Sequence, residues 1–113
     1  MSKELEDRFN AFAMRVRDFC RLVKWDIINI EYIRQLIRAS GSVAANYVEA
    51  SDDLGPADER MKIKIARREA KESKLWLGLV LTYQDFQLEQ ERLFLIDESE
   101  QILKILSSIL KKL

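Results

Sequence analysis

The chain has 113 residues, of which 48% are hydrophobic and 34% charged, which excludes a disordered chain and leaves room for one domain. Its 19 basic and 19 acidic residues give no net charge, whereas strongly nucleic-acid-binding domains usually carry a basic excess. The single cysteine excludes an internal disulfide framework, and the longest apolar run, 75–81, is too short for a membrane span. The first residues are acidic, unlike those of a signal peptide, so we expect a cytoplasmic location by default. We expect one domain over residues 1–113 and no membrane partner.

The first predicted helix covers residues 3–24, where apolar side chains recur every three or four positions. Ser2 is its expected N-cap. Cys20 lies beside the apolar seam, where a thiol behaves as a small hydrophobic group. The seam itself consists of Leu5, Phe9, Phe12, Val16, Phe19 and Val23.

The second predicted helix covers residues 30–51, with Asn29 as its cap. Small side chains dominate positions 39–45, and Gly41 lowers the helix propensity by about 1 kcal/mol relative to alanine. We therefore expect a close helix–helix contact there. The inward face is predicted to contain Ile33, Leu36, Ile37, Ser40, Val43, Ala44, Tyr47 and Ala50.

The third predicted helix covers residues 57–84, after a loop that ends at Pro56. Its inward row is Ile63, Ala66, Ala70, Ser73, Leu77 and Val80. The fourth helix covers residues 92–112, because the apolar periodicity lapses between Gln84 and Glu91. Its apolar face is Ile96, Leu103, Leu106, Leu110 and Leu113. Four such helices with short links predict an all-α fold, an antiparallel up-and-down four-helix bundle.

The residues of a catalytic site are missing from the sequence. Without histidine, Cys20 and the serines lack a general base, and no glycine-rich phosphate loop occurs. An all-carboxylate metal site at Glu69 and Glu72 is conceivable, but pairing with nearby arginines is favoured. We expect no enzymatic activity, cofactor or metal. Polar side chains beside the small residues of the second helix and on the third helix form what we call the polar motif. We predict a structural role for it, with partner recognition as the alternative. The polar motif comprises Arg38, Asn46, Glu49, Arg68, Glu69 and Glu72.

A row of cations follows the third helix on one outward side, and such rows can neutralise phosphates. The row is Arg60, Lys64, Arg67, Lys71 and Lys74, and the first helix offers an extension through Arg17, Arg21 and Lys24. A solvated helix face is the alternative interpretation. No exposed aromatic residues interleave with the row as they do in a single-strand stacking platform.

The end of the third helix is apolar on nearly every side, more than one buried stripe requires. We expect a second copy of the chain to cover the excess, since exposed apolar patches of this kind mark interfaces. The alternative is that this turn lies at the centre of the bundle. The predicted oligomer interface is Leu75, Trp76, Leu79 and Tyr83.

Two segments carry a family resemblance: residues 38–50, RASGSVAANYVEA, and residues 65–77, which include IARREAKES and LWL. They resemble the bacterial four-helix bundle family of 23S ribosomal RNA intervening-sequence proteins. Asn46, Glu49 and Ala50 match the Asn-x-x-Glu-Ala form of its second-helix motif. The similarity extends over the whole chain in length and helix layout.

The resemblance implies an antiparallel bundle that often assembles as a ring-shaped homopentamer. Some members are encoded within insertions in ribosomal RNA genes. Related bundles are accessory proteins of diversity-generating retroelements, which bind RNA and a reverse transcriptase through basic surfaces. We therefore predict a non-enzymatic oligomeric bundle that binds RNA through a basic helix face. The alternative is a protein-only scaffold that binds itself and another protein such as a reverse transcriptase.

Overall fold

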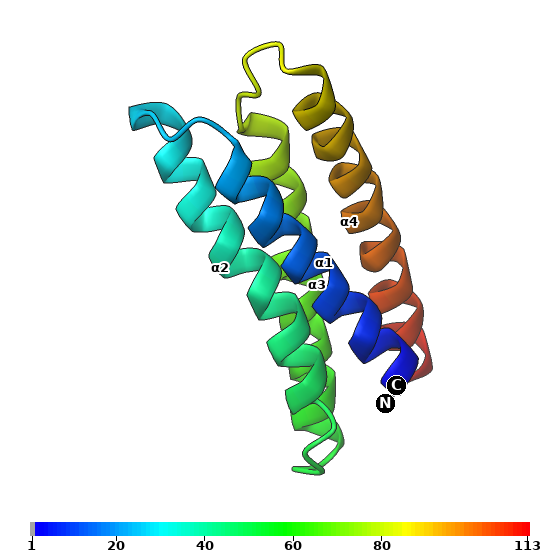
Figure 1. Cartoon of the computed structure of the whole chain (residues 1–113). Helices are drawn as coiled ribbons and strands as arrows, with labels where there is room; N and C mark the ends of the chain where they lie inside the picture. The colour runs from blue at the N-terminus through cyan, green and yellow to red at the C-terminus, as the bar shows by residue number, and fades with distance from the viewer. Residues whose placement is uncertain (1) are drawn as a thin grey trace.

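The computed structural model describes residues 2–113 and forms a bundle of four helices, with no strand in that range. The helices are α1 (Lys3–Leu22), α2 (Ile27–Glu49), α3 (Pro56–Leu79) and α4 (Phe86–Lys112). Successive helices run antiparallel in a body of 46 × 22 × 19 Å (Figure 1). Each helix packs beside two neighbours, and within residues 2–113 no Cα atoms of the diagonal pairs α1/α3 and α2/α4 come within 8 Å of each other. The predicted antiparallel four-helix bundle is confirmed.

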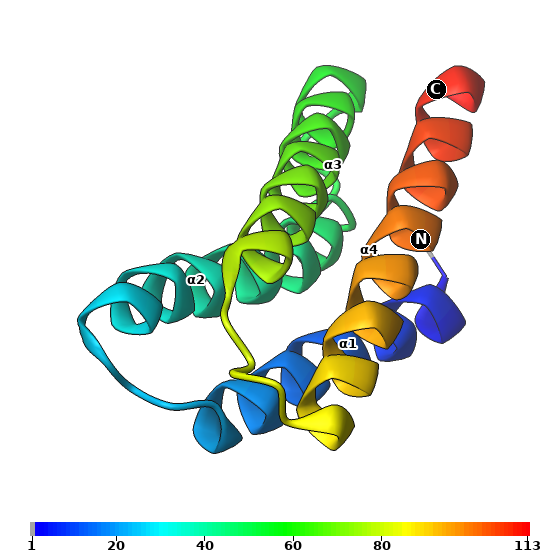
Figure 2. The ribbon, with the colours of Figure 1, turned by 90° about the horizontal axis from the view of Figure 1, so that it is seen from above.

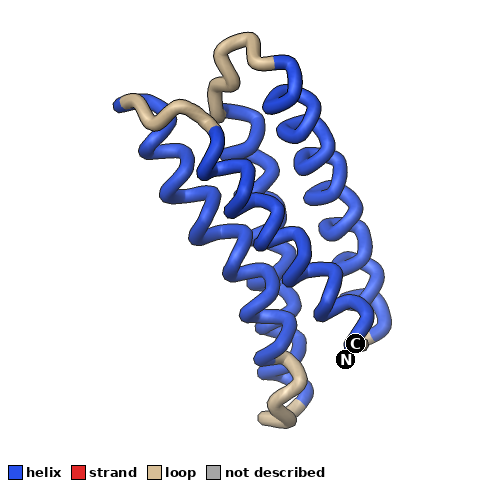
Figure 3. The backbone as a smooth tube through the Cα atoms, viewed as in Figure 1, coloured by secondary structure: helices blue, strands red, loops and turns tan. Residues whose placement is uncertain are grey.

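The connections are short and lie at the two ends of the bundle (Figure 3). The α1–α2 and α3–α4 loops share one end, which faces the viewer when the bundle is seen from above (Figure 2). The α2–α3 loop lies at the other end, toward which both termini point (Figure 1). No helix in the described range is long and apolar enough to cross a membrane.

Capping side chains set where α1, α2 and α4 begin, whereas α3 begins at Pro56 without a side-chain cap. Ser2 caps α1 as predicted, its hydroxyl accepting a hydrogen bond of 3.2 Å from the Leu5 amide. The prediction for the second helix was wrong: Asp26 is the cap, and its carboxylate accepts from the amides of Ile28 and Asn29. The helix consequently begins three residues earlier than expected.

The boundary between α3 and α4 also differs from the prediction. α3 ends at Leu79, and α4 begins at Phe86 behind its cap Asp85, which accepts a 3.0 Å hydrogen bond from the Leu88 amide. Tyr83 and Gln84 have φ angles of 53° and 66°, which no continuing right-handed helix permits. The predicted third helix was therefore too long and the fourth too short.

The core is formed by one inward face from each helix. Phe9 and Tyr47 meet edge to face at 4.8 Å between ring centroids. The predicted rows of the first and third helices are buried, except that Leu5 is half-buried. Cys20 is buried as expected, and burial raises the pKa of its thiol to about 12.

Two predicted rows require correction. Ile37 is 45% exposed, because the buried face of α2 centres on Leu36 and the next residue points about 100° round from it. The inward row of α4 is Leu95, Ser99, Ile102, Leu106 and Leu110. Of the predicted row, Ile96 and Leu103 are half-buried beside it and Leu113 is exposed, since the apolar stripe of α4 is wider than its core-facing side.

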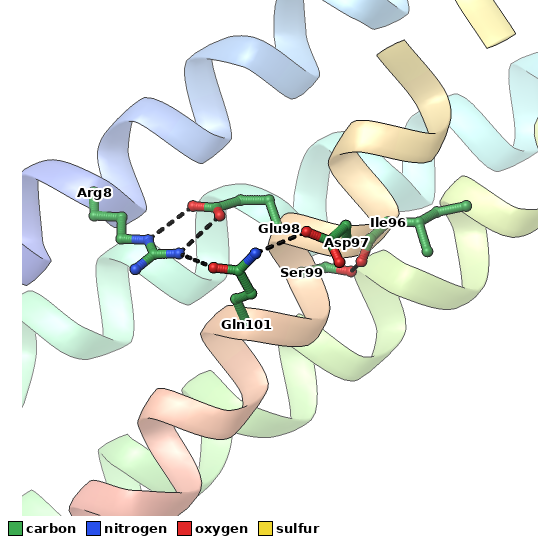
Figure 4. A network of polar contacts seen from close by, with 6 residues as sticks. All are labelled: Arg8, Ile96, Asp97, Glu98, Ser99 and Gln101. Atoms are coloured by element: carbon green, nitrogen blue, oxygen red, sulfur yellow. Dashed lines mark hydrogen bonds and ion pairs between the residues drawn. The ribbon is translucent and has the colours of Figure 1, made fainter. Parts of the chain in front are cut away.

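Polar contacts join α1 to α4 on the outside of the core. The Arg8 guanidinium binds both carboxylate oxygens of Glu98 at 2.9 Å and also donates to Gln101 (Figure 4). About two helical turns nearer the loop that follows α3, Arg15 makes the same two-pronged contact with Glu91 and lies 3.8 Å from the centre of the Phe94 ring. Cations on this side of the bundle therefore have acidic partners.

Candidate nucleic-acid interface

The cations of the third helix line hollows between α3 and α4. One hollow, of about 600 Å³, is lined by Lys64, Arg67 and Lys71 together with Met61, Ile65, Arg68, Leu103 and Ser107. A second, of about 230 Å³, shares Lys64, Arg67 and Ser107 and adds Arg60, Leu110 and Lys111. We call this continuous surface the basic groove, defined by Arg60, Lys64, Arg67, Lys71 and Lys111.

Most of these cations have no acidic partner. Within residues 2–113, no ion pair of 4.0 Å or less involves Lys64, Arg67, Lys71 or Lys111, and Arg60 donates to the Leu110 carbonyl at 3.3 Å. Lys74, the last cation of the predicted row, is 2.5 Å from a Glu100 carboxylate oxygen. The basic groove is therefore a local positive surface on a protein with no net charge, and Lys74 contributes little to it.

The structure does not bring the predicted basic residues of α1 and of the loop after it to this surface. α1 packs beside α2 and α4, and in the described part of the chain no Cα atom of α1 lies within 8 Å of one in α3. Arg17 pairs with the neighbouring Asp18 at 3.1 Å, and the Lys24 ammonium lies 5.4 Å from the centre of the Tyr83 ring. The expected extension through Arg17, Arg21 and Lys24 is thus on a different side of the bundle.

The apolar end of α3 follows the basic groove along the helix, since Leu75 is one turn beyond Lys71, and it leads to the loop before α4. Leu75 is 54% exposed, Leu79 41% and Tyr83 51%. Trp76 differs, because it is half-buried and its ring stacks on Tyr32 of α2 at 6.1 Å. The Tyr83 hydroxyl donates to the Asp26 carboxylate, which ties this loop to the start of α2.

Comparison with known proteins places the chain. The model of the 23S rRNA-intervening sequence protein family matches residues 10–108. The chain belongs to this family. A similar solved structure is that of a protein with unknown function from the S23 ribosomal protein family of Bacteroides thetaiotaomicron VPI-5482. It is 28% identical, with a TM-score of 0.79, and the match covers 94% of this chain and 97% of that one. No curated protein matches the chain.

This member of the 23S rRNA-intervening sequence protein family has two groove residues that the sequence did not assign to nucleic acid. Lys111 enters the basic groove from α4, and Arg68 lines it rather than pairing closely with an acid. The spacing along α3 could reveal only the cations of α3. Finding Lys111 requires knowing which side of α4 faces α3, which depends on packing.

The predicted polar motif of this family member is mostly a set of links along α2 and α3. Glu49 pairs with Lys62 at 3.0 Å, and the Asn46 amide donates to the carbonyl and hydroxyl of Ser42. Arg38 lies 4.0 Å from Glu69 and donates to Gln35. In residues 2–113, no group of three or more potential metal-ligating side chains is arranged to hold a metal ion.

Glu69 is the unusual member of this motif, since it is only 5% exposed and its Oε2 atom has no hydrogen-bond partner within the described residues. Burial raises its pKa above the ordinary value of 4.5, and the neighbouring Glu72 raises it further, while Arg38 and Arg68 lower it. The pKa of Glu69 is therefore higher in the folded protein than in the unfolded chain. Between these two values, the folded protein keeps a proton on Glu69 that the unfolded chain has released.

We expect the free energy of unfolding to fall as the pH rises from 4.5 through the folded pKa of Glu69, because ionising a buried carboxyl is unfavourable. Glu69→Gln should remove this contribution and be more stabilising, relative to the wild type, near neutrality than below 4.5. Urea unfolding near neutral pH and below pH 4.5 measures this difference in stability. Glu31→Gln, at an exposed position of α2, is the control. Equal differences at both pH values would contradict the assignment.

Proposed function

We propose that this member of the 23S rRNA-intervening sequence protein family is a non-enzymatic RNA-binding module that uses the basic groove. The observation that carries the proposal is the convergence of Lys64, Arg67, Lys71 and Lys111 without acidic partners. Like charges held together cost free energy unless an anion neutralises them, and a polyphosphate backbone supplies such anions at close spacing.

The class of anion is suggested by the relatives. The matching family is named for intervening sequences of 23S rRNA, and the similar solved structure is assigned to a ribosomal protein family. Both point to RNA rather than to a small anion. Phosphate contacts position a protein without reading bases, so the proposed binding has weak sequence specificity. The cytoplasm, where such RNA is found, is the proposed location.

The proposal is tested by titrating RNA with the protein at several salt concentrations. Each neutralised phosphate contributes about −0.9 to the log–log slope on a duplex and about −0.7 on a single strand. The groove cations therefore predict a slope of about −3 to −4. A flat salt dependence, or no binding at low salt, would contradict RNA binding and favour the protein-only scaffold.

We further propose that the module self-associates through the exposed apolar end of α3, with the pentamer implied by the family resemblance as the expected assembly. The apolar side chains of Leu75 and Leu79 are exposed to water in the single chain, and a second copy would cover them. Leu75 lies one helical turn beyond Lys71 on α3, so contact between copies at Leu75 and Leu79 would border that end of the basic groove, whereas Arg60 lies about 22 Å farther along the helix axis from Leu75. Several grooves on one particle would raise the apparent affinity for a long RNA.

Leu75→Glu combined with Leu79→Glu is expected to dissociate this assembly while leaving the helices intact, because both side chains are exposed in the single chain. Trp76→Glu is a poorer test, since Trp76 also packs against Tyr32. Light scattering measures the particle mass, with Leu54→Glu in the α2–α3 loop, also highly exposed, as the control. An unchanged mass in the double variant would refute the interface.

A further inference from the structure

The basic groove presents its charges on a rigid, straight support. Arg60, Lys64, Arg67 and Lys71 are spaced four, three and four residues apart on the continuous helix α3, which places them along about 16 Å of its axis. Lys111 and Ser107 come from α4, packed along the same side. The positions of the backbone atoms that carry these side chains are therefore fixed before any ligand arrives.

The lining of the groove between the charges is aliphatic. Met61, Ile65 and Leu103 contribute to its surface, and within the described residues no aromatic side chain lines it. The nearby large aromatic rings are engaged elsewhere: Trp76 stacks on Tyr32 beside α2, and Phe94 lies beneath Arg15 beside α1. The groove thus offers phosphate neutralisation but no surface on which an unpaired base can stack.

These two properties select between the forms of RNA. A single strand loses conformational freedom when it is fixed along a rigid row, and proteins that bind single strands offset this loss by stacking, worth about 1–3 kcal/mol per base. A duplex is already ordered, keeps its bases stacked internally and presents phosphates at fixed spacing. Its recognition depends on shape and on contacts to phosphates and 2′-hydroxyls across the wide minor groove.

We infer that the basic groove binds the sugar–phosphate backbone of double-stranded RNA, an inference that rests on the RNA-binding function proposed above. The cations of α3 contact phosphates, while the Ser107 hydroxyl on the α4 wall is placed to exchange a hydrogen bond with a 2′-hydroxyl. Double-stranded RNA regions, rather than loops or unpaired ends, are then the ligand.

Fluorescence anisotropy on the full chain tests the inference with three probes: an RNA duplex of about 16 base pairs, an unstructured RNA strand of equal phosphate number, and polyglutamate of equal charge. We expect the duplex to bind at least about tenfold more tightly than the strand at the same salt, with the steeper salt slope. Polyglutamate should compete weakly.

Each contrary outcome has a separate meaning. A strand that binds as tightly as the duplex overturns the duplex inference but leaves the proposed RNA-binding function standing. Polyglutamate that displaces the duplex at equal charge overturns the inference and assigns the groove to acidic protein segments. Failure of both RNA probes to bind contradicts the proposed function and, with it, the inference. As a positional check, Ser107→Ala should reduce the preference for duplex RNA over duplex DNA.

Discussion

Replacing Asn29 with leucine is expected to lower the free energy of unfolding by about 3 kcal/mol, although the two side chains are similar in size. Asn29 is fully buried, and its amide nitrogen donates to the carbonyls of Lys24 and Leu81, both at 2.9 Å. Its oxygen accepts from the Leu81 amide at 2.9 Å. Leucine leaves these three backbone groups without a partner, and each costs about 1–3 kcal/mol where water cannot replace the bond.

Urea unfolding followed by circular dichroism measures the effect at a fixed protein concentration, since self-association would also shift the midpoint. Asn10→Leu, on the exposed side of α1, is the matched control and should change little. Asn29→Asp separates hydrogen bonding from packing, because it keeps the acceptor but turns a carboxylate oxygen toward two carbonyls. If Asn29→Asp retained wild-type stability, the two donated bonds would not matter.

Asn29 also shows where sequence reasoning stops. An asparagine before an apolar helix is a reasonable cap, but Asp26 stands three residues earlier and has the same chemistry. Only the packing of two loops distant in sequence reveals that Asn29 joins the α1–α2 connection to Leu81. Local patterns identified the four helices, whereas this contact across 52 residues had no local signal.

The register of α4 illustrates a second limit. Apolar side chains occupy several sides of that helix, so periodicity alone does not distinguish a row through Ile96 and Leu103 from the true row through Leu95 and Ile102. The inward rows of α1 and α3 were predicted correctly, apart from the half-buried Leu5. The same ambiguity hid Lys111 from the predicted basic row, because the side of α4 that faces α3 was not determined.

The cations themselves could be recognised by spacing, but their partners could not. The sequence placed Lys74 in the same row as Lys71, and only the structure shows Glu100 of α4 beside it. Conversely, Arg17, Arg21 and Lys24 looked equivalent to the α3 row until the diagonal position of α1 separated them. The local positive surface depends on how α3 and α4 pack together. The net charge of the whole chain does not reveal it.

Removing three groove charges together is expected to weaken RNA binding about 100- to 1,000-fold at roughly 100 mM salt. The variant combines Lys64→Ala, Arg67→Ala and Lys71→Ala, whose side chains line the basic groove and have no ion pair among the described residues. Each lost phosphate contact should reduce the magnitude of the log–log salt slope by nearly 1, so that the slope becomes shallower by about 2 to 3. Folding should persist, since alanine favours helix.

The matched control, called the α1 variant, removes the same charge from the other side of the bundle, through Arg17→Ala and Arg21→Ala on α1 and Lys24→Ala in the loop that follows it. If binding depended only on net charge, both triple variants would lose affinity equally, because each changes the net charge by the same amount. If the groove is the site, the α1 variant should retain most of the affinity and nearly all of the salt slope, because long-range attraction is screened beyond about 10 Å at this ionic strength. An α1 variant that fails as badly as the groove variant would move the RNA-binding surface away from α3 and α4.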